Sequence, residues 1–128
     1  MPVKYLSQEW IDAYNATVAA DDAVRKALKG KNAAIQMVVS DAPDGEVRYW
    51  LRIGDGTASV GLGDADSAEV TISQSYDTSA KVNRGELDGQ KAFTQGKVKI
   101  TGKMLKMMQL RAPLAEVQKA LNTIDTEY

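Results

Sequence analysis

The sequence predicts an α+β fold, in which a mostly antiparallel sheet is covered by helices on one face. Two patterns lead to this prediction. Apolar residues recur with helical spacing near both ends of the chain, and they alternate with polar residues across its middle, as in half-buried strands. The chain has 128 residues, of which 44% are hydrophobic, so we expect residues 1–128 to form a single domain with its own core.

Two helices are expected first. Ser7 and Asp21 are good N-cap residues for a longer and a shorter helix, and Gly30 is a typical residue at the end of the second. Apolar residues recur at four-residue steps through the longer helix and share one of its faces: Leu6, Trp10, Tyr14 and Val18.

The middle of the chain predicts consecutive strands. Apolar and polar residues alternate over 34–39 and 47–53, and the turn-forming residues 41–45 lie between these runs, which is typical of a hairpin. The motif Gly54-Asp55-Gly56 predicts a second tight turn before a strand over 57–62, and a further strand is expected over 69–73.

Two short helices and a last strand are expected next. Ser75 and Asp88 are N-cap residues for helices that end at Gly85 and near Phe93. Lysines alternate with apolar residues over 97–100, which predicts a strand with one wet face that ends at Gly102.

The end of the chain is expected to form two helices separated at Pro113. The residue before a proline is pushed out of the helical region, so a helix over 103–111 should end there and another should begin with Pro113 in its first turn. The second helix carries an apolar stripe of Leu114, Val117 and Leu121. Because it would be attached at one end only, it is expected to be either a mobile lid or the last core helix.

The composition excludes most catalytic chemistry. The chain has no cysteine and no histidine, so disulfides, thiolate or histidine metal sites and Ser-His-Asp triads are ruled out. The glycines within 54–56 and 61–63 complete no phosphate-binding motif and are interpreted as hairpin turns. We therefore expect no catalytic residues, no metal, no cofactor and no enzyme activity.

Positive charge is concentrated in one segment. The formal net charge is −1, which does not favour a nucleic-acid-binding protein, but residues 81–111 contain eight Lys and Arg against two Asp and Glu. Such a segment is either a solvated face or a basic surface that contacts anionic membranes transiently. The residues expected at a membrane contact are Lys91, Lys97, Lys99, Lys103 and Lys106.

The chain shows no targeting or membrane-spanning pattern. No apolar run approaches the length of a membrane span, and the first residues contain no apolar signal-peptide core, so we expect a cytoplasmic protein.

Methionine is also concentrated. Three of the five methionines fall within residues 104–108. They are either ordinary core residues or the lining of an apolar pocket for ligands of varied shape, because methionine is unbranched and repacks easily.

Segments 85–93 (GELDGQKAF) and 95–102 (QGKVKITG), followed by a helix rich in Met and Leu, resemble the sterol carrier protein 2 (SCP2) family. The resemblance covers most of the chain, although Gly89 and Lys103 stand where family members often have Pro and Asn. It implies a five-stranded sheet whose helices enclose a hydrophobic tunnel for sterols, fatty acids, fatty acyl chains or phospholipids, without catalysis.

We therefore expect a lipid-binding or lipid-transfer protein that is a monomer or a weak dimer. The alternative is an accessory or dimerisation module that delivers a lipid substrate to a partner enzyme. The residues expected to line the tunnel are Ile35, Met37, Tyr49, Leu51, Ile72, Phe93, Ile100, Met104, Leu105, Met108, Leu114, Val117 and Leu121.

Overall fold

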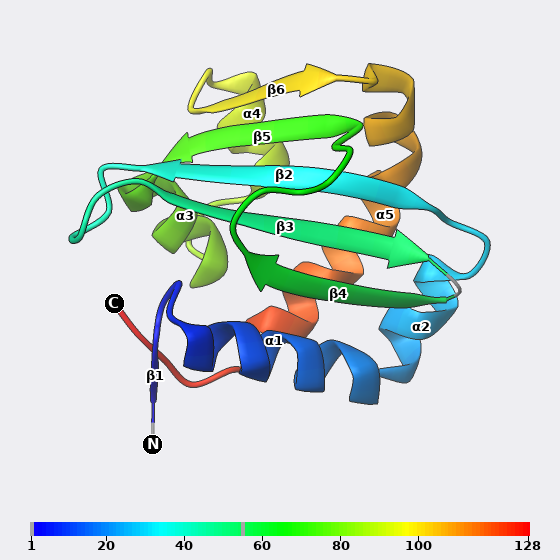
Figure 1. Cartoon of the computed structure of the whole chain (residues 1–128), viewed down its shortest axis with the longest axis horizontal. Coiled ribbons are helices and arrows are strands. Elements are labelled where there is room, and N and C mark those ends of the chain that lie inside the picture. The colour runs from blue at the N-terminus through cyan, green and yellow to red at the C-terminus, as the bar shows by residue number, and fades with distance from the viewer. Residues whose placement is uncertain (1, 55) are drawn as a thin grey trace.

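In the computed structural model, which describes residues 2–54 and 56–128, a five-stranded sheet has helices behind one face and along one edge (Figure 1). The strand order is β4-β3-β2-β5-β6, with β2 and β5 parallel and the other neighbours antiparallel. The predicted α+β class and sheet are confirmed, although Asp55 of the predicted second turn lies outside the described residues. The strands are β2 Ala33–Ser40, β3 Val47–Gly54, β4 Thr57–Leu62, β5 Val70–Ser75 and β6 Val98–Gly102.

Local sequence signals place the helices. The predicted N-cap residues are confirmed, because each accepts a hydrogen bond from a backbone N–H of the first helical turn: Ser7, Asp21, Ser75 and Asp88. The helices are α1 Gln8–Ala20, α2 Asp22–Leu28, α3 Tyr76–Asn83, α4 Gly89–Thr94 and α5 Met104–Leu121.

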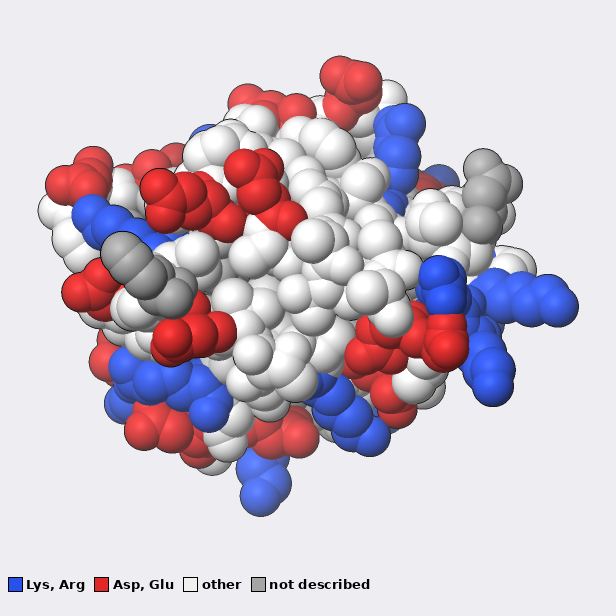
Figure 2. Space-filling model, turned by 90° about the horizontal axis from the view of Figure 1, so that it is seen from below, with Lys and Arg blue, Asp and Glu red and all other residues white. Residues whose placement is uncertain are grey.

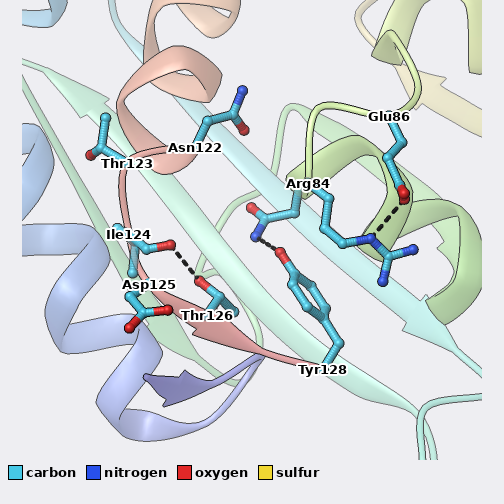
Figure 3. Close-up of a pocket in the computed structure, with 9 residues that line it drawn as sticks. Arg84, Glu86, Asn122, Thr123, Ile124, Asp125, Thr126 and Tyr128 are labelled. Carbon is cyan, nitrogen blue, oxygen red and sulfur yellow. Dashed lines mark hydrogen bonds and ion pairs between the residues drawn. The ribbon is translucent and has the colours of Figure 1, made fainter. Parts of the chain in front are cut away.

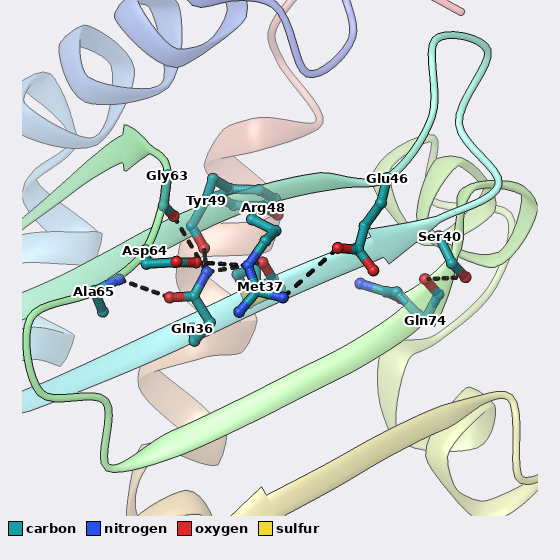
Figure 4. Close-up of polar contacts among 10 residues, drawn as sticks. All are labelled: Gln36, Met37, Ser40, Glu46, Arg48, Tyr49, Gly63, Asp64, Ala65 and Gln74. Carbon is teal, nitrogen blue, oxygen red and sulfur yellow. Dashed lines mark hydrogen bonds and ion pairs between the residues drawn. The ribbon is translucent and has the colours of Figure 1, made fainter.

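The connection from β4 to β5 crosses the face of the sheet that the helices leave open (Figures 1 and 4). Gln36 of β2 holds it in place: its Nε2 donates to the carbonyl oxygens of Tyr49 and Gly63, both at 3.2 Å, and its Oε1 accepts from the Ala65 N–H at 2.6 Å. The Nε of Arg48 adds an ion pair with Asp64 at 2.5 Å. The crossing explains why a polar side chain on this face is buried.

The outer edge of β4 is covered by α1. The side-chain amide of Asn15 pairs with the backbone of Val60 as a neighbouring strand would, donating to its carbonyl at 3.0 Å and accepting from its N–H at 2.8 Å. An edge strand whose backbone groups are paired in this way is protected against further strand addition. Figure 2 shows this side of the molecule, where an uncharged area is bordered by charged residues.

A short parallel pair joins the two ends of the described chain, and no sequence pattern predicted it. In this pair β1 (Val3–Lys4) lies beside β7 (Thr126–Glu127). The N–H of Tyr5 also donates to the carbonyl of Glu127 at 2.9 Å. The residues that follow α5 are thus fastened to the start of the chain.

The prediction of a helix break at Pro113 is wrong. Pro113 lies inside the single helix α5, where its ring is buried. A proline removes the bond to the carbonyl four residues earlier and costs about 3 kcal/mol in a helix. Burial of Leu110, Val117 and Leu121 on both sides of it offsets that cost. The lid prediction depended on the break and on a free end, and the structure has neither.

Candidate functional site

Four predicted tunnel residues form one row across the helix-covered face of the sheet. The strand register places Tyr49 beside Met37, Met37 beside Ile72 and Ile72 beside Ile100. Tyr49 is buried, whereas Met37, Ile72 and Ile100 are only half-buried although they pack against the core. The row therefore becomes less well covered from β3 towards β6.

The next row is covered completely as far as β5. Leu51, Ile35 and Val70 are register neighbours, and all three are buried. We call α1, α2, β3 and β4 the packed half of the molecule. We call β5, β6, α4 and the first half of α5 the open half, because several of its apolar side chains are incompletely covered, among them Ile72, Ile100 and Met107.

The inward face of α5 carries a continuous apolar stripe opposite these rows. Leu110, Val117 and Leu121 are buried, and Met107 and Leu114 are half-buried against the core. The predicted residues Leu114, Val117 and Leu121 thus lie with the strand residues. Sequence reasoning missed Met107 and Leu110, although spacings of three and four residues through Pro113 connect them to the stripe.

The other predicted tunnel residues do not join this group. Met104, Leu105 and Met108 lie on the outward face of α5 and are 43%, 71% and 69% exposed, and Phe93 of α4 is 41% exposed. The prediction placed a helix break at Pro113 and so did not extend the spacing of Leu114 and Val117 back along the chain. It therefore selected the outward-facing methionines instead of Met107. These four side chains are on the surface in this structure.

Polar contacts hold the first half of α5 on both sides. The Nζ of Lys106 donates to the carbonyl of Asn32 at 2.8 Å and lies 3.6 Å from a carboxylate oxygen of Glu69. On the other side, the Nε of Arg111 donates to Oε1 of Gln90 on α4 at 2.9 Å. Lys106, predicted as a membrane contact, is therefore also part of the fastening of α5.

Gly102, the last residue of the QGKVKITG segment, sets the direction of α5. Its φ of +107° belongs to a region that side-chain-bearing residues rarely adopt, and a Cβ there would collide with the carbonyl oxygen of Glu69. The N–H of Lys103 donates to that same carbonyl at 2.9 Å. A glycine is thus required where β6 passes into α5.

A separate, open pocket of about 550 Å³ lies between the end of α5 and the segment after α3 (Figure 3). Its lining is mostly polar. The Nε of Arg84 lies 2.7 Å from a carboxylate oxygen of Glu86, and the guanidinium stacks on the ring of Tyr128. With its cation already paired, this pocket is poorly suited to an acyl chain or an anion.

No cluster of three or more potential metal-ligating side chains occurs among the described residues. Burial raises the pKa of Tyr14 and of Tyr49 above the ordinary tyrosine value. None of the helices in residues 2–54 and 56–128 is long and apolar enough to cross a bilayer. The rows of the sheet and the stripe on α5 are lined mainly by apolar side chains.

Comparison with known proteins gives one family and a set of related folds. The chain matches the SCP-2 sterol transfer family over residues 11–115. No curated protein sequence matches it significantly.

Three solved structures illustrate the fold. A crystal structure of sterol carrier protein 2 is similar with a TM-score of 0.81 at 20% identity, covering 94% of this chain and 99% of that one. The conserved hypothetical protein TT1886 of Thermus thermophilus gives 0.80 at 20% identity, with 98% and 92% covered. Palmitated SCP2L2 of Aedes aegypti gives 0.65 at 20% identity, with 94% and 97% covered. The chain belongs to the SCP-2 sterol transfer family.

Proposed function

We propose that this chain, acting as one domain, is a non-catalytic lipid carrier that holds a fatty acid or fatty acyl chain between the sheet and α5. The observation that carries the proposal is the incomplete burial of Met37, Ile72 and Ile100 on the sheet face that the helices cover. The half-buried Met107 and Leu114 belong to the stripe on α5. Apolar side chains left partly uncovered at the edge of a core favour an apolar ligand as the missing cover.

The chemistry of this region matches an acyl chain. Each buried methylene contributes about 0.8 kcal/mol, so a sixteen-carbon chain offers about 10 kcal/mol before ordering costs. No specific polar partner is needed for useful affinity, and methionine repacks around different shapes. We therefore expect broad selectivity among sterols, fatty acids and fatty acyl chains.

Family membership supports the proposal at the level of lipid binding. One solved relative is described as palmitated, which supports a fatty acid as the first ligand to test. The polar pocket beside Tyr128 is the competing location, and its paired charges argue against it.

Native mass spectrometry of delipidated protein mixed with palmitate tests the proposal. We expect one palmitate per chain. Ile100→Ala and Met107→Ala should each weaken binding about fivefold to tenfold, because each removes methylene contacts. Val60→Ala, a buried position in β4, is the matched control and should lower stability without changing affinity.

Three results would contradict the carrier role. They are no complex with palmitate, an equal loss of affinity in the Val60 control, or an empty protein that sediments as a stable dimer. The last result would favour the alternative role, a dimerisation module that serves a partner enzyme.

A further inference from the structure

The sheet has two outer strands, β4 and β6, and the structure treats their free edges differently. Asn15 of α1 pairs with the backbone of Val60 and so occupies the free edge of β4. β6 is the outermost strand on the opposite side (Figure 1). In the described part of the chain, no backbone hydrogen bond reaches residues 98–102 except those of the ladder with β5. We call the outer side of β6 the β6 edge, and it is where the sheet can be extended.

Alternate residues of β6 present their backbone to this edge. In an antiparallel pair, every second residue bonds the partner strand, and the residues between turn their N–H and C=O groups outward. The Lys103 N–H donates to the Glu69 carbonyl at 2.9 Å on the side of β5, and by the same alternation Lys99 also faces β5. Val98 and Ile100 therefore turn their N–H and C=O groups towards the β6 edge.

The exposed side chains beside the β6 edge are basic. Lys97 and Lys99 are exposed, and no ion pair joins either of them to another described residue. The register places Lys99 beside Ser73, on the sheet face opposite the helices. Residues 89–115 contain six Lys and Arg and no Asp or Glu, so this segment supplies no acidic partner of its own.

Apolar side chains lie on the other face of the same strand. Ile100 is half-buried and ends the row that begins at Tyr49, so the sheet has no further strand residue beside it. Phe93, which is 41% exposed, lies in the turn before β6, where the Gly96 N–H donates to its carbonyl at 3.0 Å. A strand added at the β6 edge would place every second side chain on this face, where an apolar side chain would extend the row.

The lysines decide which kind of strand fits the β6 edge. If two copies of the chain paired through this edge, Lys97 and Lys99 of both copies would come together, and like charges across a strand pair are destabilising. Acidic side chains on the added strand would instead form ion pairs with these lysines. Charge therefore favours an acidic strand from a different protein over a second copy.

We propose that the β6 edge binds an extended, acidic segment of a partner protein as a sixth strand of the sheet. Acidic side chains of the segment lie beside Lys97 and Lys99, and apolar side chains at the alternate positions lie beside Ile100. The backbone of the segment pairs with that of Val98 and Ile100. In this mode of recognition, backbone hydrogen bonds provide affinity and alternate side chains provide specificity. The proposal does not rest on the carrier role.

A fluorescein-labelled synthetic peptide of sequence EVEIEVE, titrated by fluorescence anisotropy, tests the charge pattern. We expect this peptide to bind and KVKIKVK, which has the same apolar residues, not to bind. Lys97→Gln/Lys99→Gln should weaken binding about fivefold, because it removes two cross-strand ion pairs. Lys26→Gln/Lys29→Gln is the matched control: it removes two exposed lysines at the end of α2 and should change binding less than about twofold.

N-methylated peptides separate backbone pairing from charge. In an extended peptide, alternate N–H groups point to opposite edges, so methylation of one alternate set blocks pairing with β6 and methylation of the other set faces solvent. We compare EVEIEVE methylated at its apolar residues with EVEIEVE methylated at its acidic residues. One of the two should bind about tenfold more weakly or worse, and the other should lose less than about threefold.

Hydrogen exchange measured by NMR locates the bound peptide. With EVEIEVE at ten times its Kd, the amide hydrogens of Val98 and Ile100 should exchange about tenfold more slowly, because only about one chain in eleven is then free. The Val60 N–H already bonds Asn15 and should not change.

Five outcomes would overturn the proposal. They are no binding of EVEIEVE, equal binding of KVKIKVK, an equal loss in the Lys26/Lys29 control, full affinity of both N-methylated peptides, and slowed exchange at Val60 instead of Val98 and Ile100. The fourth outcome would reduce the contact to charge without strand pairing.

Discussion

The packed half and the open half of this molecule use the same kinds of side chain and differ in how well those side chains are covered. Trp10 and Val18 of α1 and Val24 and Leu28 of α2 are at most 1% exposed. In the open half, Ile72, Ile100 and Met107 are half-buried, and Met108 is mostly exposed. The difference teaches that one apolar layer is closed by protein side chains in one part and left partly uncovered in another, where we propose that lipid binds.

Aromatic packing accounts for part of the contrast. The ring of Trp10 lies edge-on to Tyr5, Tyr14 and Tyr49, with centroids 4.9, 5.3 and 5.7 Å away. Such arrangements add to the free energy gained by burial. The indole Nε1–H has no conventional hydrogen-bond acceptor within the described residues.

The largest expected effect compares two isoleucines of the same sheet face. Ile35→Ala removes a fully buried side chain from β2 and should lower the free energy of unfolding by about 4 kcal/mol. Ile72→Ala, on the neighbouring β5, should cost about half as much, because Ile72 is already partly exposed. Urea denaturation of the delipidated variants measures both. Equal losses would show that Ile72 of the open half is packed as well as the fully buried Ile35 of the central strand β2.

The next effect concerns the turn that sets the direction of α5. Gly102→Ala should lower the free energy of unfolding by about 3 kcal/mol, because it adds a backbone collision to an unfavourable φ. Gly45→Ala is the control: its φ of +103° is similar, but no atom lies within 4 Å of the new Cβ. The control should cost about 1 kcal/mol. If the two variants lose the same free energy of unfolding, the close approach of Gly102 to the Glu69 carbonyl does not constrain the start of α5.

Lipid should stabilise one half more than the other. A fatty acid at one hundred times its dissociation constant should raise the free energy of unfolding by about 2.7 kcal/mol. Hydrogen exchange should then slow most in β6 and in residues 104–110, with little change in α1 and β4. Slowing confined to α1 and β4 would place the ligand in the packed half.

The smallest expected effect is the response of the packed half to alkali. Burial raises the pKa of Tyr49, so above pH 10 an unfolded chain loses a proton that the folded chain keeps. Stability should therefore fall as the pH rises from 10, by about 1.4 kcal/mol per pH unit for this group. Tyr49→Phe should reduce that slope by the same amount in urea titrations. Parallel slopes for the two proteins would contradict the buried-phenol account.

Local patterns predicted most of the fold and only part of the candidate site. N-caps such as Ser75 and alternation such as that around Ile100 depend on neighbouring residues, so the sequence reveals them. The pairing of β1 with β7 joins residues far apart in the chain, and so do the hydrogen bonds from Gln36 to the connection between β4 and β5. No local pattern encodes either contact.

Pro113 explains the error in the site. Its local preference argued for a helix break, and tertiary burial on both sides overrode that preference. With the helix continuous, the phase of its apolar stripe selects Met107 and Leu114 rather than Met104 and Met108. The predicted strand residues share one row because the register of the sheet sets their positions, whereas Met104 and Met108 lie on the surface because packing decides how α5 continues through Pro113.

The proposal that lipid binds in the open half and not in the packed half is tested most directly by NMR spectroscopy of the protein with isotope-labelled palmitate. Intermolecular contacts should join the acyl chain to the methyl groups of Ile72, Ile100 and Met107. The methyl groups of Val60 and Ala58, on β4 of the packed half, should show none. Contacts with β4, or a ligand that perturbs only Arg84 and the polar pocket around it, would contradict the assignment of lipid binding to the open half.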